Sequence, residues 1–165
     1  MMTNAADDPA PDWRAAELEG RSIEWMEALR FGSPERTLGL TREGRWIVAL
    51  DHDQRTELHE LAGEAAIAAL PLLQRPFAEV KVALERRLGS WGTEEAHEPP
   101  TDTIYRAALA SGSPFWIGAA ASWMDESLPR SIPAAELREL ASSKRLDQSV
   151  RHRLLRVAGR LEAAG

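Results

Sequence analysis

The segment DHDQRTELHE, residues 51–60, holds the densest group of side chains that could do chemistry. Asp51, His52 and Asp53 are consecutive, and His59 follows His52 by seven residues, which would place both imidazoles near one face of a helix. Carboxylate oxygens and imidazole nitrogens bind divalent metal ions, and the same groups act as general acids and bases. These four residues are therefore the candidates for a small metal-dependent or acid–base enzyme.

A structural explanation of the same segment is favoured. His59 and Glu60 begin an HExxH pattern that fails, because Gly63 stands where the second histidine is required. Aspartate is also one of the residues that commonly precede the first turn of a helix, which explains Asp51 or Asp53. We therefore predict no metal and no other cofactor, and the enzyme remains the alternative to a function without catalysis.

Two Gly-Ser-Pro turns raise the question of a phosphate-binding or nucleophilic loop. They end the similar segments ALRFGSP, residues 28–34, and ALASGSP, residues 108–114. A phosphate-binding loop needs GxxxxGK followed by Ser or Thr, and a serine nucleophile elbow needs GxSxG; the chain contains neither. The turns predict corners between helices, in which Gly ends one helix and Ser and Pro begin the next.

Three arginines, Arg153, Arg156 and Arg160, would form a stripe on a C-terminal helix over 147–163. The net charge of the chain is −6, but residues 131–165 carry seven Lys or Arg and four Asp or Glu, a net of +3. Such a stripe could bind an acidic partner or phosphates. A solvated helix face is favoured, because nucleic-acid binding relies on a positive field that an acidic chain lacks.

Two of the six tryptophans have no obvious place in a core. Trp13 follows a small, acidic segment, residues 1–12, which we expect to be a flexible tail. Trp91 lies in residues 90–101, a stretch rich in acidic residues and Pro that we expect to be a linker. Use in the core or at its edge is favoured for both, and the alternative is that one or both anchor a partner protein.

The spacing of apolar residues predicts helices through most of the chain. The predicted helices cover residues 13–31, 51–70, 76–89, 102–111, 114–126, 133–142 and 147–163. Residues 36–50 are ambiguous, because Leu38 and Leu40 facing Trp46, Val48 and Leu50 across a tight turn would form a β-hairpin. The GSP match, which places Pro34 at a helix start, makes the hairpin the less favoured alternative.

Three ordered matches indicate an internal duplication. Besides the GSP turns, ELHELA at 57–62 matches ELRELA at 136–141, and VKVALERRLG at 80–89 resembles VRHRLLRVAG at 150–159. We therefore predict a mainly α fold, a single helical domain over 13–165 built as an antiparallel helical array. Two related repeat units, 22–90 and 102–160, would stack as a short α-solenoid, with chance similarity as the competing explanation.

The remaining features favour a cytoplasmic binding protein. There is no cysteine, which suits a reducing compartment, and no run of 18 apolar residues, so we expect a soluble chain with no membrane partner. No catalytic motif accompanies the predicted helices. The sequence therefore predicts a protein-interaction or scaffold module with an unidentified protein partner, and nucleic-acid binding as the weaker alternative.

Overall fold

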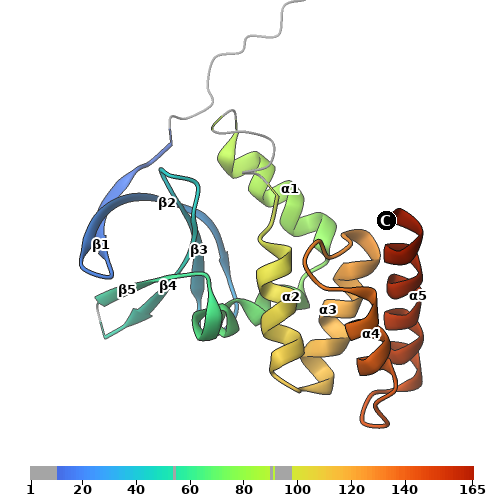
Figure 1. The fold of residues 1–165 in the computed structure, drawn as a ribbon. Coiled ribbons are helices and arrows are strands. Elements are labelled where there is room, and N and C mark those ends of the chain that lie inside the picture. The colour runs from blue at the N-terminus through green and yellow to red at the C-terminus, as the bar shows by residue number, and fades with distance from the viewer. Residues whose placement is uncertain (1–10, 54, 90, 92–97) are drawn as a thin grey trace, which may run out of the picture. The chain divides into compact units, whose positions relative to one another are not determined.

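The computed structural model describes residues 11–53, 55–89, 91 and 98–165, and is drawn in Figure 1. The chain divides into two compact units, each assembled from two stretches of sequence. Unit 1 contains residues 1–61 and 78–99, and unit 2 contains residues 62–77 and 100–165.

Unit 1 is built on a five-stranded antiparallel sheet, not on helices. The strands are β1 (Arg14–Leu18), β2 (Arg21–Phe31), β3 (Arg36–Thr41), β4 (Trp46–His52) and β5 (Arg55–Glu60), and each pairs with the next along the chain. The sheet curves until β1 and β5 come into contact, which makes it a nearly closed barrel (Figure 1). The predicted mainly α fold and α-solenoid are therefore wrong.

One face of the sheet holds a compact apolar cluster. Ile23, Trp25 and Ile47 lie there with Leu18 and Ala49, all buried. The ring of Trp25 lies over Gly39 of the neighbouring strand, where an added Cβ would be only 2.6 Å from Cε3 of Trp25. Glycine at position 39 is what lets the indole approach the backbone this closely.

The opposite face of β3 and β4 is also buried. Leu38, Leu40 and Val48 point to that side, and all three are fully buried. Strands buried on both faces lose the alternation of apolar and polar residues that marks a strand in sequence. Residues 36–50 form the hairpin that was the less favoured alternative, with Leu40 opposite Trp46 and Leu38 opposite Val48. Only β4, with the run WIVAL, lacks the alternation.

Helix α1 (Phe77–Leu88), all of which except Phe77 belongs to unit 1, contacts strand β2 at an irregularity. The pairing of β2 with β3 shifts between Glu27 and Leu29, which leaves Ala28 as a bulge. Arg87 Nε donates a hydrogen bond to the carbonyl oxygen of Glu27, at 3.0 Å. The carbonyl beside the bulge therefore finds its partner on α1.

Unit 2 is helical. It contains the 3₁₀ helix η1 (Gly63–Gln74) and the α-helices α2 (Thr101–Ala110), α3 (Pro114–Glu126), α4 (Ala134–Ala141) and α5 (Gln148–Ala164). Trp123 of α3 donates its indole N–H to the carbonyl of Arg75 at 2.8 Å, and its ring meets Phe77 edge to face. The four predicted helices from residue 102 onward are confirmed, as is the helix predicted over 76–89.

Two predicted helices are wrong. Residues 13–31 form β1 and β2 with a turn at Glu19 and Gly20, and residues 51–60 end β4 and form β5. Backbone pairing in hairpins, β1 with β2 and β4 with β5, overrides the helical spacing in both segments. The three matched pairs thus do not describe two helical units. The first GSP, residues 32–34, is a turn between β2 and β3 and not a corner between helices, and ELHELA lies mostly in β5.

The predicted tail and linker are not tested by the structure. The predicted tail, residues 1–12, and linker, residues 90–101, fall mostly outside the described residues, and their boundaries stay predictions. Within the described part of the chain, no helix combines the length and apolar character that a membrane span requires.

Candidate functional site

The structure spreads the candidate catalytic residues along two strands. Asp51 and His52 end β4, Asp53 occupies the turn with a positive φ of 43°, and His59 lies opposite Val48 in β5. The register places His52 and His59 four residues apart along the ladder, about 13 Å at the rise of a strand. The two imidazoles therefore lie on two neighbouring strands and not on one face of a helix, as was predicted.

Each of these polar side chains has a local structural contact or an exposed position. The Thr56 hydroxyl donates to Asp51 Oδ1 at 2.6 Å, and His59 Nε2 lies 3.6 Å from Glu57 Oε2. Asp51, His52 and Asp53 are exposed. In the part of the chain that the structure describes, no three His, Cys, Asp or Glu side chains gather as metal ligands would.

The arginine stripe of α5 converges on the end of α3. Arg153 Nε lies 3.0 Å from Asp125 Oδ2, and Arg156 donates to both carboxylate oxygens of Asp125, at 3.2 and 2.7 Å. Arg160 donates to the carbonyl of Asp125 at 2.7 Å. These bonds raise the pKa of Arg156 and join α5 to the negative end of the α3 dipole.

The two tryptophans proposed as partner anchors contact one another. The rings of Trp13 and Trp91 meet edge to face with centroids 5.0 Å apart, and the Arg42 guanidinium lies 5.1 Å from the Trp13 centroid. Both indoles are half-buried. The structure thus gives Trp13 and Trp91 a role within unit 1, and their use as anchors stays a prediction.

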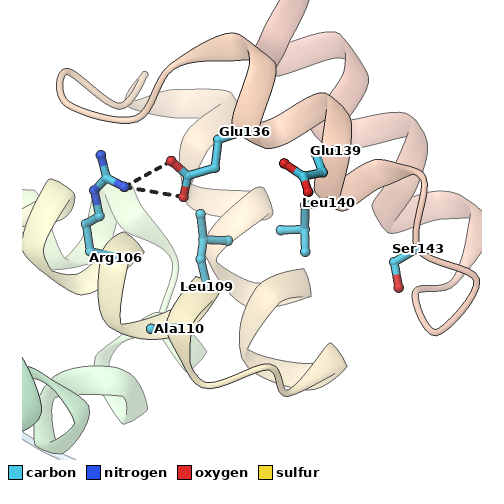
Figure 2. A pocket seen from close by; sticks show the side chains of 7 residues that line it. All are labelled: Arg106, Leu109, Ala110, Glu136, Glu139, Leu140 and Ser143. Carbon is cyan, nitrogen blue, oxygen red and sulfur yellow. Dashed lines mark hydrogen bonds and ion pairs between the residues drawn. The ribbon is translucent and has the colours of Figure 1, made fainter.

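A groove of about 460 Å³ lies between α2 and α4 in unit 2 (Figure 2). Its lining has an apolar middle and polar ends. Leu109 and Ala110 of α2 and Leu140 of α4 form the middle, and both leucines are half-buried. The polar lining comes from Arg106, Glu136, Glu139 and Ser143.

Arg106 connects the two walls at one end of the groove. Its Nη1 donates to both carboxylate oxygens of Glu136, at 3.0 and 3.3 Å, and its Nη2 donates to the carbonyl of Ser131. These bonds satisfy the charge of Glu136. Glu139 is exposed, and its carboxylate has no hydrogen bond or ion pair with any residue that the structure describes.

Helix α2 also fixes the loop that leads into α4. Asp102 accepts the backbone N–H groups of Arg130 and Ser131, the former at 2.8 Å. The hydroxyl of Tyr105 donates to the carbonyl of Ser127 at 3.0 Å, and burial raises the pKa of Tyr105, which keeps the hydroxyl protonated as a donor. These contacts set the position of α4 and therefore the width of the groove.

Sequence reasoning did not find this groove. Its residues follow helical spacing, at positions 106, 109 and 110 on α2 and at 136, 139, 140 and 143 on and after α4. That spacing is a detectable signal, but an apolar stripe on a helix normally indicates a core face. The structure shows instead that Leu109 and Leu140 are only half-buried, because a groove separates α2 from α4.

Comparison of the chain with protein-family models, with curated proteins and with solved structures gives no match.

Proposed function

We propose that the protein is a protein-interaction module, and that the groove between α2 and α4 binds an apolar, helix-forming segment of a partner protein. The observation that carries this proposal is the pair of half-buried leucines, Leu109 and Leu140, in the middle of a groove with polar ends. Binding sites typically combine an apolar lining with a few polar groups that fix orientation.

The size of the groove supports a side-chain-sized occupant. Its volume of about 460 Å³ lies within the range of roughly 300–1,000 Å³ typical of ligand pockets. Covering the two leucines with apolar groups would remove their exposed surface from water, which is the main favourable term in such association.

The shape of the lining favours a helix as the occupant. Glu136, Glu139 and Leu140 of α4 follow the spacing i, i+3 and i+4, which is about 6 Å of helical rise, and Ser143 follows just after the helix. A groove bounded by two helices over this length matches the apolar ridge of a third helix, as in other helix-in-groove complexes.

The test is a selection of peptides from a displayed random library on the purified full-length chain. We expect enriched peptides with apolar residues at spacings of three and four. Leu109→Glu and Leu140→Glu should each weaken their binding at least tenfold, because a charge would be placed where an anchor side chain is buried.

Leu155→Glu is the matched control, because Leu155 is an exposed leucine of α5, 39% accessible, outside the groove lining. Circular dichroism and thermal melting of all three variants establish that they fold. Failure to enrich any peptide, or equal binding by the groove variants and the control, would contradict the proposal.

A further inference from the structure

We infer that the segment bound in the α2–α4 groove carries a Lys or Arg beside its apolar anchor, and that Glu139 pairs with this cation. The inference rests on the proposed function, because it specifies the charge of the same partner. It follows from the state of the three charged side chains that line the groove: Arg106, Glu136 and Glu139.

Two of the three charges neutralise one another. Arg106 contacts both oxygens of Glu136, and its second terminal nitrogen is held by the carbonyl of Ser131. Neither group is free to select a partner without breaking these bonds. The lining therefore carries one uncompensated charge, the carboxylate of Glu139.

The nearby charge of Glu139 affects a bound segment more strongly than the net charge of unit 2 does. Unit 2 contains ten Lys or Arg and eight Asp or Glu, a net of +2, but salt screens exposed charges beyond about 8 Å under physiological conditions. Lys144 and Arg145 follow Ser143 without lining the groove. A bound segment therefore meets the negative charge of Glu139 at close range.

The position of Glu139 determines where the cation must lie. Glu139 directly precedes Leu140 in α4, and both side chains line the groove (Figure 2). A Lys or Arg can lay its methylene stem along Leu140 while its charged end reaches the carboxylate. The cation is thus expected within one turn of the residue that fills the apolar middle.

The test compares parallel library selections on the wild-type chain, on Glu139→Lys and on Glu126→Lys. Glu126 is an exposed glutamate of α3 outside the groove lining, which makes it the matched control. We expect Lys and Arg to be enriched beside the anchor on the wild type and the control, and Asp and Glu to replace them on Glu139→Lys.

A single selected peptide gives the magnitude. Replacing its basic residue with Gln should weaken binding to the wild type roughly two- to fivefold, the range for an exposed ion pair. On Glu139→Gln the same replacement should have no effect, and high salt should remove the difference on the wild type.

The outcomes separate this inference from the proposed function. Peptides that need Leu109 and Leu140 but show the same charge preference on the wild type and Glu139→Lys would overturn the inference and leave the proposed function standing. Peptides that bind without the two leucines, or none at all, would overturn the proposed function itself.

Discussion

Two segments of nearly identical sequence adopt different structures in this molecule. ELHELA, residues 57–62, forms most of β5, whereas ELRELA, residues 136–141, forms most of α4. The segments differ only at their third residue, His59 or Arg138. Since the residues themselves are almost the same, the difference must come from the surrounding chain.

The two copies bury opposite leucines. In the first copy, Leu58 of β5 is half-buried and Leu61, just after the strand, is buried. In the helix, Leu137 is fully buried and Leu140 is half-buried beside the groove. The strand copy is held by backbone pairing with β4, in which Leu58 lies opposite Ala49. The helix copy is instead preceded by Pro133 at its N-cap.

The comparison teaches that this hexapeptide has no decisive conformational preference of its own. Glu, Leu and Ala all favour helices, and β5 contradicts that preference only because its neighbour β4 offers a complete ladder. A tight turn at Asp53, which has a positive φ, directs the segment back along β4, where it pairs as a strand.

The sharpest way to test the comparison is to truncate the four leucines one at a time. Leu137→Ala should reduce the free energy of unfolding by about 3 kcal/mol, because it leaves a cavity in a fully buried site, and Leu61→Ala by a comparable amount. Leu58→Ala and Leu140→Ala should cost about 1 kcal/mol each, since both side chains are already partly exposed. Urea unfolding of each variant measures the differences.

The order of these four effects is the informative result. If the first leucine of each copy cost the same, and the second leucine likewise, the two segments would not occupy different environments. A helical β5 would produce that pattern.

Two glycines extend the comparison from the hexapeptides to the sheet and the helices. Gly39→Ala in β3 should destabilise the protein by about 1–3 kcal/mol, because its Cβ would overlap the Trp25 ring. Gly159→Ala in α5 should stabilise it by about 0.5–1 kcal/mol, since nothing lies within 4 Å of its added Cβ and alanine favours a helix. Thermal melting should show a lower melting temperature for Gly39→Ala and a higher one for Gly159→Ala if the glycines have these different roles.

The smallest expected effect on stability comes from Arg138, the third residue of the helical hexapeptide. Arg138 donates to both oxygens of Glu162, at 2.9 and 2.7 Å, and these bonds lower the pKa of Glu162. A lowered pKa stabilises the folded state above the carboxyl's unfolded pKa, and this contribution is lost as the pH falls through the folded value.

A double-mutant cycle of Arg138→Ala and Glu162→Ala measures this pair. We expect a small favourable coupling at neutral pH that disappears in acid and in high salt, because both side chains are exposed. A coupling that persisted in acid would contradict the ion pair as its source.

The sequence predicted the helices from residue 76 onward and failed for the sheet. Helices such as α5 reveal themselves by apolar residues at spacings of three and four. In β4 the run WIVAL is apolar on both faces and gives no alternation. In β3, Leu38 and Leu40 do alternate with smaller or polar residues, but the GSP match, which placed a helix start at Pro34, outweighed that signal. The helical spacing in residues 13–31 was equally compatible with two strands, which pair with one another across the turn at Glu19 and Gly20.

The candidate sites illustrate the same limit. His52 and His59 were grouped because seven residues place side chains on one helix face, and this argument no longer applied once the residues lay on two strands. The groove was not predicted because Leu109 and Leu140, which lie on its opposite walls, are 31 residues apart in the chain. No local spacing links two helices across a gap.

The interleaving of the two units along the chain has a consequence for synthesis. The strands of unit 1 pair only with successive neighbours, and hairpins form in about 1–10 μs. Helix η1 contacts α2 and α3, yet 26 residues, 75–100, separate its end from the start of α2, and a ribosome needs roughly 1–5 s to add them. During synthesis there is therefore an interval in which the sheet can already be complete. In that interval η1, which carries Leu70 and Leu72, does not yet have the helices that it contacts in the folded protein.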